Sequence, residues 1–118
     1  MRYLCLIYDD EKAFASLSKA DHDSLMGEYR AFGESLQRGR HYVSGYQLAP
    51  ATAGRTVRVR DGKVSSTDGP YAETKEQLGG YYLIEARNLD EAAQVASRIP
   101  SARFGSVEVR PLHDSHQT

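Results

Sequence analysis

A run near the start of the chain, residues 3–8, is apolar at every position and constrains the fold more than any other feature. Its sequence is Tyr-Leu-Cys-Leu-Ile-Tyr. Successive side chains of a β-strand point to opposite faces of a sheet, so a strand of this kind needs cover on both faces. Residues 81–86 form a second, mostly apolar run. The two runs predict the central strands of a sheet that is buried on both sides.

Two amphipathic helices accompany these strands. Ser18 can cap the first, which should end near Gly39. Its apolar stripe repeats at spacings of four, three and four: Leu25, Tyr29, Phe32 and Leu36. Asn88 and Glu91 form a capping box for the second helix, and Pro100 closes it. The expected apolar face of the second helix is Leu89, Ala92, Ala96 and Ile99.

The remaining segments read as strands and connections. Residues 42–48 and 106–110 predict further strands, the last with the alternation of an edge strand. Residues 56–60 and 63–67 flank Asp61-Gly62, which is typical of a tight hairpin turn. Residues 9–12 are expected to be a solvated turn. Residues 72–78 are expected to form one or two helical turns.

The element order predicts an α+β fold in one domain, residues 1–112, followed by a polar C-terminal tail, residues 113–118. It runs β-α-β, then a hairpin, then β-α-β. This order favours a ferredoxin-like βαββαβ sheet with an extra β-hairpin and both helices on one face. The second face of the sheet would then be apolar and uncovered, so we expect a homodimer packed sheet to sheet.

Composition bounds the partners and the compartment. Fifteen Lys and Arg against 16 Asp and Glu leave a net charge of -1, which gives no electrostatic drive toward nucleic acid or anionic membranes. The single cysteine, Cys5, cannot form an internal disulfide, and no leader or membrane span is visible, so a cytoplasmic location is expected. His113 and His116 lie three apart without a third ligand nearby, so no metal or other cofactor is expected.

Residues 68–82, DGPYAETKEQLGGYY, closely resemble the signature of the YCII-related family, in particular its DGPF branch. Tyr71 stands where that branch usually has Phe. Residues 3–8 and 98–111 are similar to the opening and the ending of the family's sequences, so the likeness spans nearly the whole chain. The resemblance implies a dimeric α+β barrel with a cleft beside it. It also implies an association with extracytoplasmic-function sigma factors.

The same resemblance implies an acid/base pair of His and Asp in the cleft. Asp68 is the natural match for the Asp, whereas the His matches either His22 or, counted from the other end of the helix, Glu28. Asp68 can equally cap its own Gly-Pro turn, and His22 can equally be a packed or rim histidine. Both alternatives stay open.

Two functions remain at this stage. In the first, the chain is a cofactor-free lyase or isomerase acting on a small metabolite, with Asp68 and His22 as base and acid. Lys75 would hold an anionic group, and Tyr71 and Glu73 would bind the substrate; the alternative is a solvated charged cluster and packing aromatics. In the second, it is a non-catalytic dimeric module that binds a ligand or a protein, with a regulatory role linked to a sigma factor.

Overall fold

A four-stranded antiparallel sheet forms the centre of the structure, a computed structural model that describes residues 1–113. Its spatial order is β2 (Tyr42–Gln47), β5 (Gln77–Glu85), β1 (Arg2–Asp9) and β6 (Ser106–Pro111). The two apolar runs therefore occupy the two central strands, β1 and β5, as predicted. Of the expected tail, only His113 lies within the described residues.

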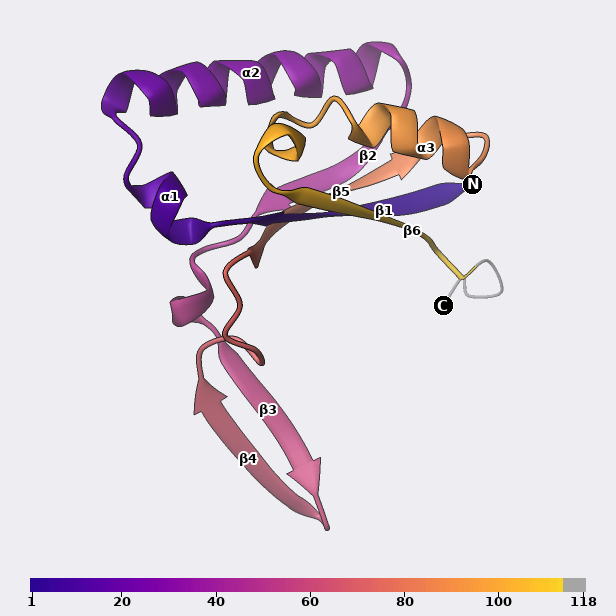
Figure 1. Cartoon of the computed structure of the whole chain (residues 1–118). Helices are drawn as coiled ribbons and strands as arrows, with labels where there is room; N and C mark the ends of the chain where they lie inside the picture. The colour runs from indigo at the N-terminus through magenta and orange to yellow at the C-terminus, as the bar shows by residue number, and fades with distance from the viewer. Residues whose placement is uncertain (114–118) are drawn as a thin grey trace.

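Both long helices lie on the same face of this sheet: α2 (Lys19–Arg38) and α3 (Leu89–Ala96) (Figure 1). The predicted caps are confirmed. The Ser18 hydroxyl accepts a hydrogen bond from the Asp21 amide at 3.1 Å, and the Asn88 side chain accepts one from the Glu91 amide at 2.9 Å. Each cap satisfies an amide that the first helical turn leaves without a partner.

The opposite face of the sheet has no helix over it in the described part of the chain (Figure 1). Alternate residues of β1 point toward the helices and are at most 5% exposed: Tyr3, Cys5 and Ile7. The intervening residues point the other way and are only half-buried: Leu4, Leu6 and Tyr8. Leu83 and Tyr81 of β5 pair with Leu4 and Leu6 and are half-buried too. We call this surface the open face; it is apolar along both central strands.

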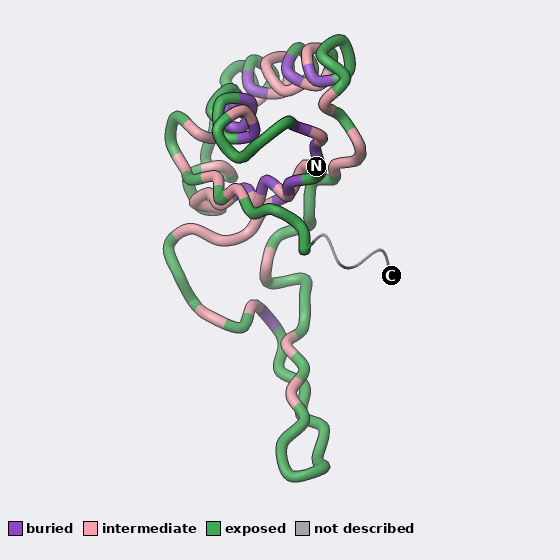
Figure 2. Tube along the Cα trace, turned by 90° about the vertical axis from the view of Figure 1, so that its right-hand side faces the viewer, coloured by how far each residue is buried: buried purple, intermediate pink, exposed green. Residues whose placement is uncertain are grey.

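A hairpin of β3 (Arg55–Arg60) and β4 (Lys63–Asp68) protrudes on the side of the open face (Figures 1 and 2). It forms a two-stranded sheet of its own, and every residue of β4 is exposed. The predicted turn is confirmed, since Asp61 and Gly62 have φ of 53° and 75°. The radius of gyration is 16.2 Å, against about 13–14 Å for a compact chain of this length. We call this hairpin the arm.

Two connections differ from the sequence prediction. Residues 9–12 are not a turn alone, because α1 (Glu11–Ala15) begins there with Asp10 as its cap. Residues 72–78 form no helical turns: the Gln77 side-chain amide donates to the carbonyl oxygens of Ala72 and Thr74, both at 3.0 Å, and these bonds hold a loop. Strand β5 therefore starts at Gln77, inside the segment that was expected to be helical.

The predicted face of the second helix needs one correction. Leu89 is the first residue of α3 and is 49% exposed, whereas Val95 is 4% exposed and takes its place in the core. Short 3₁₀ turns, η1 (Ala51–Ala53) and η2 (Pro100–Arg103), complete the described chain. No helix within residues 1–113 is both long enough and apolar enough to cross a membrane.

The turn after β4 depends on a glycine. Gly69 has a φ of 99° and its amide bonds to the Gly54 carbonyl at 2.8 Å. We expect Gly69→Val to lower the free energy of unfolding by about 1–3 kcal/mol, because side chains other than hydrogen are strained at this angle. Gly54→Val is the matched control across the same hydrogen bond, since Gly54 has an ordinary φ of -96°. Equal urea-unfolding midpoints for the two variants would contradict the expectation.

Candidate functional site

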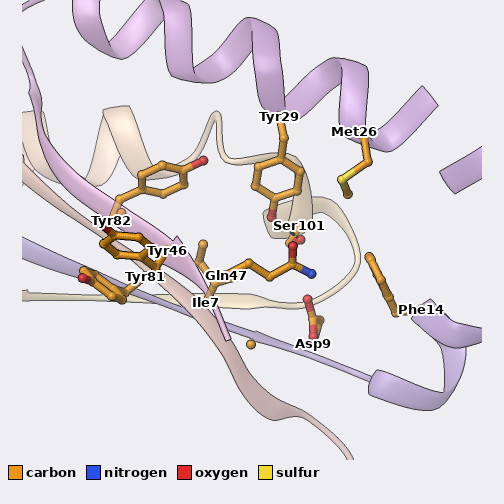
Figure 3. A pocket seen from close by; sticks show the side chains of 13 residues that line it. Ile7, Asp9, Phe14, Met26, Tyr29, Tyr46, Gln47, Tyr81, Tyr82 and Ser101 are labelled. Carbon is orange, nitrogen blue, oxygen red and sulfur yellow. Dashed lines mark hydrogen bonds between the residues drawn. The ribbon is translucent and has the colours of Figure 1, made fainter. Parts of the chain in front are cut away.

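A cavity of about 230 Å³ lies between α2 and one end of the sheet (Figure 3). Residues from β1, α1, α2, β2, β5 and η2 line it. The side chains that bear on its chemistry are Asp9, Phe14, Tyr29, Tyr82 and Ser101. We call this space the site cavity.

The carboxylate in the site cavity belongs to Asp9, the last residue of β1. The pKa of Asp9 is raised, first by burial and then by the negative charges of Glu11, Glu76 and Asp10. No donor in residues 1–113 forms a hydrogen bond that would offset these effects. Asp9 therefore takes up a proton at a higher pH than an ordinary aspartate, as a general base or acid requires.

The backbone of β5 makes room for this carboxylate. The pairing of β1 with β5 shifts by one residue between Ile7 and Tyr8, which leaves Gly79 as an extra residue beside Asp9. A Cβ atom at Gly79 would lie 3.0 Å from the Asp9 Oδ1 atom, closer than ordinary contact. A glycine in a strand often marks such a close approach.

Two hydroxyl groups lie above Asp9. Tyr29 reaches from α2 toward Ser101 of η2, and their oxygens are 2.5 Å apart (Figure 3). Ser101 is only 2% exposed, and the hydrogen bond with Tyr29 gives its buried hydroxyl a partner. Burial and the nearby charge of Asp9 raise the pKa of Tyr29, whose hydroxyl accordingly stays neutral and able to donate near pH 7. Burial also raises the pKa of Tyr82, on the cavity wall, to about 12.

This arrangement can support proton transfer. A carboxylate with a raised pKa can take a proton from carbon, and neutral hydroxyl groups can donate to an oxygen on which charge develops. Burial raises the pKa of the Cys5 thiol to about 11, so Cys5 is not a thiolate nucleophile. Within residues 1–113, no three His, Cys, Asp or Glu side chains are grouped to hold a metal ion.

A second cavity of about 500 Å³ adjoins the first and shares Asp9 and Phe14 with it. Lys75 lines it, so one of the predicted substrate-binding residues shares a cavity with Asp9. Glu28 and Arg103 line it as well and form an ion pair, and the hydrogen bond from Arg103 lowers the pKa of Glu28. Glu28, the alternative match for the family histidine, therefore lines the same cavity as Asp9 and Lys75, whereas His22 does not.

The predicted catalytic pair, Asp68 and His22, lies on separate parts of the described chain. Asp68 ends β4 in the arm, is 84% exposed and accepts a hydrogen bond from Arg55 Nε at 3.1 Å. His22 lies in α2, is 45% exposed and packs edge to face on Phe14 with ring centroids 5.6 Å apart. Neither lines the site cavity or the adjoining one. Their roles as base and acid stay a prediction.

The other two predicted residues lie in the loop between β4 and β5. Tyr71 is 82% exposed and lines an open groove of about 980 Å³ at the base of the arm. Glu73 is exposed in the same loop. Their roles in substrate binding stay predictions, because neither residue lines the site cavity or the adjoining one.

Sequence reasoning did not single out Asp9 or Ser101 and placed Tyr29 only in the helix stripe. One available signal was a pair of aspartates directly after a buried strand. The other was Gly79-Gly80 at the start of a predicted strand, since small residues there leave space for a side chain from a neighbour.

Comparison with known proteins identifies the family. The model of the YCII-related domain matches residues 1–115. An uncharacterized protein of Rhizobium meliloti (strain 1021), R00369, is 39% identical over 114 residues, which cover 95% of this chain and 92% of the relative. The match covers the elements that form the site cavity, from Asp9 to Ser101. The chain belongs to the YCII-related family.

Proposed function

We propose that the chain is a cofactor-independent enzyme of lyase or isomerase type that removes a proton from a small carbonyl compound. The observation that carries the proposal is the raised pKa of Asp9 in a cavity that also holds the hydrogen-bonded hydroxyls of Tyr29 and Ser101. The cavity of about 230 Å³ is smaller than the roughly 300–1,000 Å³ of drug-sized ligand sites, which favours a small metabolite.

In the proposed reaction, the Asp9 carboxylate takes a proton from the carbon next to the carbonyl group. The electrons of the broken C–H bond move to the carbonyl oxygen, which becomes an enolate oxygen and accepts a hydrogen bond from Tyr29 or Ser101. For isomerisation, Asp9 returns the proton to a different carbon. For elimination, the carbonyl group re-forms, a C=C bond forms and the bond to a leaving group on the neighbouring carbon breaks; the proton on Asp9 then passes to the departing group or to water.

Lys75 supports a substrate that carries an anionic group. It lines the adjoining cavity, and no hydrogen bond or ion pair within the described residues occupies its ammonium group. A compound with its carbonyl group beside Asp9 could extend its carboxylate toward Lys75. The negative charges around Asp9 would otherwise disfavour an anion.

The acid/base role can be tested before any substrate is known. Titration of the Asp9 carboxyl carbon by NMR should give a midpoint above the ordinary value of 3.8, because burial disfavours the charged form. The folded chain then binds this proton more tightly than the unfolded chain, so stability falls as pH rises from about 4 through the folded-state pKa. Asp9→Asn should therefore raise the melting temperature at neutral pH, and the gain should vanish below pH 3.8.

That gain should correspond to less than about 1 kcal/mol, since water partly screens a half-buried carboxylate. A midpoint at or below 3.8 would contradict the assignment of Asp9 as the base. A melting temperature that falls in the asparagine variant would show that the carboxylate is structural.

For the assembly, we propose a ferredoxin-like fold of the DGPF branch that forms a two-fold dimer through the open face. The strand order β2-β5-β1-β6 with both helices on one side supports the fold. The half-buried apolar side chains of β1 and β5 support the dimer, because a patch of this kind is rarely left exposed on a monomer. The alternative acid/base pair, Asp68 and His22, with Tyr71 and Glu73 at the substrate, would act in place of Asp9 only if that assembly brought these residues together, because Asp68 lies in the arm and His22 in α2 of one chain.

The second candidate function is a non-catalytic dimeric module that binds another protein, such as a sigma factor. The observation that favours it is the arm, which presents valines and arginines to solvent. Absence of any catalysed proton exchange, together with tight binding of a protein partner, would favour this alternative over the enzyme.

A further inference from the structure

The arm has two chemically different faces. Paired and alternate residues of a hairpin point to the same side, and Val59 pairs with Val64 while Val57 pairs with Ser66. One face therefore carries three valines, the valine stripe, which are 62%, 58% and 72% exposed: Val57, Val59 and Val64. The other face carries three cations: Arg58, Arg60 and Lys63. A hairpin with one apolar and one charged face is expected to bury the apolar face against another apolar surface.

The two strands of the arm, β3 and β4, form a sheet that is too small to be stable by itself. An isolated hairpin is marginal in water, and it needs a third strand or a packed apolar face to be independently stable. In this chain β3 packs extensively only on β4, and the valine stripe meets no core of its own. Aggregation would be the cost of leaving such a stripe uncovered.

The position of the arm indicates what covers it. The arm projects from the same side of the molecule as the open face (Figure 1). A second copy that covers the open face therefore lies directly beside the arm. Two-fold symmetry then brings the partner's arm back along the first copy, so both apolar surfaces of both chains are covered by one assembly.

A groove of about 980 Å³ lies at the base of the arm, and its lining is the surface available to the partner's arm. Apolar side chains from the end of the sheet and the adjacent loops line it: Tyr8, Leu48, Leu78, Pro70 and Tyr71. Glu76, Glu108 and Arg55 also line it, and the two glutamates are opposite in charge to the cations of the arm. An arm strand of six residues spans about 20 Å, enough for two antiparallel arms each to reach the base of the other.

We propose that in the two-fold dimer each arm lies in the partner's groove, with its valine stripe against the apolar wall. This inference rests on the proposed dimer but is separable from it, because the open faces could pair without the arms. Under this proposal Tyr71, which lines the groove, lies at the interface between chains. The arm then binds a second copy of this chain and no other protein.

Two neighbouring residues of β4 provide a matched test. Val64 lies on the valine stripe and Ser65 lies on the opposite face. Val64→Asn should raise the dimer dissociation constant by about tenfold or more in sedimentation equilibrium, since each dimer loses the contact twice. Ser65→Asn introduces the same side chain one residue away and should leave the constant unchanged. Both variants should keep the melting temperature of a folded chain at a concentration where the dimer has dissociated, because neither residue contacts the core.

Cross-linking tests the docking directly. Ala53 lines the groove just before β3, and Lys63 lies at the tip of the arm, so the length of an arm strand, roughly 20 Å, separates them along the same chain. In the chain with Ala53→Cys and Lys63→Cys, a bifunctional maleimide shorter than that span should give covalent dimers, whereas either single variant should give none.

The outcomes separate the two proposals. Dimers that are insensitive to Val64→Asn and do not cross-link would overturn the arm docking while leaving the sheet-to-sheet dimer standing. A wild-type chain that sediments as a monomer at all micromolar concentrations would overturn both. We expect Val64→Asn to weaken the dimer, Ser65→Asn to leave the dimer unchanged, and the double cysteine variant to cross-link.

Discussion

Asp9→Asn is expected to lower the rate of catalysed proton exchange by about 10²–10⁴-fold, the usual contribution of a positioned general base. Asparagine keeps the size of the side chain but cannot accept a proton near neutral pH. The measurement needs no known substrate: the wild-type chain is incubated in D₂O with a panel of small carbonyl compounds, and NMR follows the loss of their C–H signals. A compound whose exchange is accelerated then serves for comparing variants.

Asp10→Asn is the matched control for this experiment. Asp10 is the next residue, but its carboxylate caps α1 by accepting hydrogen bonds from the amides of Lys12 and Ala13 at 3.0 and 3.3 Å. Asparagine caps helices about as well as aspartate, so α1 and its Phe14 should stay in place. If the two variants lost exchange activity equally, the loss would follow from the local charge or the helix and not from Asp9 as the base.

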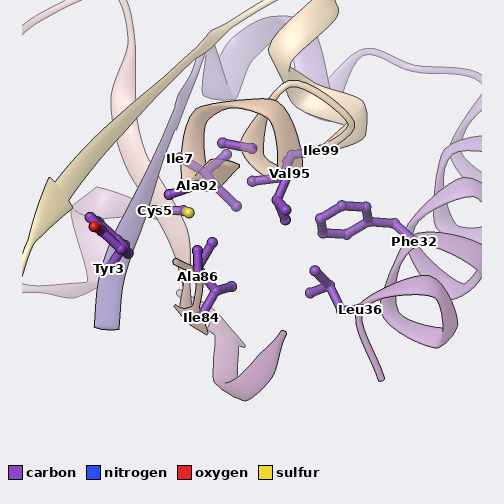
Figure 4. Packing of buried hydrophobic residues seen from close by; sticks show 11 residues of the cluster. Tyr3, Cys5, Ile7, Phe32, Leu36, Ile84, Ala86, Ala92, Val95 and Ile99 are labelled. Carbon is purple, nitrogen blue, oxygen red and sulfur yellow. The ribbon is translucent and has the colours of Figure 1, made fainter. Parts of the chain in front are cut away.

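Much of the fold could be predicted because burial imposes a pattern on the sequence. The stripe of the long helix is confirmed: Leu25, Phe32 and Leu36 are each at most 6% exposed. Figure 4 shows Phe32 and Leu36 reaching toward the side chains of the central strands and of α3. The continuous apolar run of β1 and the 3.6-residue repeat of the helix both arise from packing against one core, so they can be read without coordinates.

The elements that were missed depend on contacts between distant residues. Helix α1 has only five residues, fewer than an isolated helix needs, and tertiary contacts support it. Phe14 packs on His22, and the Glu11 carboxylate accepts a hydrogen bond from the Ala51 amide at 2.9 Å. The Glu11 hydrogen bond joins residues 40 positions apart in the sequence, so no local pattern predicts it.

The candidate site could not be read from spacing for the same reason. Asp9 ends a strand, Tyr29 lies in the middle of a helix, and Ser101 lies in a 3₁₀ turn 72 residues further along. Tyr29 also belongs to a regular apolar stripe, which gives it a sufficient structural explanation in the sequence. Only the fold shows that its hydroxyl meets a buried serine above a carboxylate.

Two glycine-to-alanine substitutions should change the free energy of unfolding in opposite directions, because the fold leaves room for a Cβ atom at one glycine and not at the other. Gly33 lies inside α2, and a Cβ atom there would have no neighbour within 4 Å among the atoms that could obstruct it. Gly33→Ala should therefore stabilise the chain by about 0.5–1 kcal/mol, because alanine loses less backbone freedom on forming a helix. Nothing in the local sequence distinguishes this glycine from one that the fold requires.

Gly105, just before β6, is such a glycine. A Cβ atom at Gly105 would overlap the carbonyl oxygen of Tyr8 and lie 3.3 Å from the Cα atom of Asp9. Gly105→Ala should lower the free energy of unfolding by about 1–3 kcal/mol, since backbone atoms on a central strand must shift to accept it. For a chain of this size, that corresponds to a fall in Tm of roughly 4–12 °C, measurable by circular dichroism or calorimetry. The shift also displaces Asp9, so proton exchange should slow at temperatures where the variant is still folded. Full exchange activity in a folded Gly105→Ala chain would show that the position of Asp9 does not matter, and would contradict its assignment as the base.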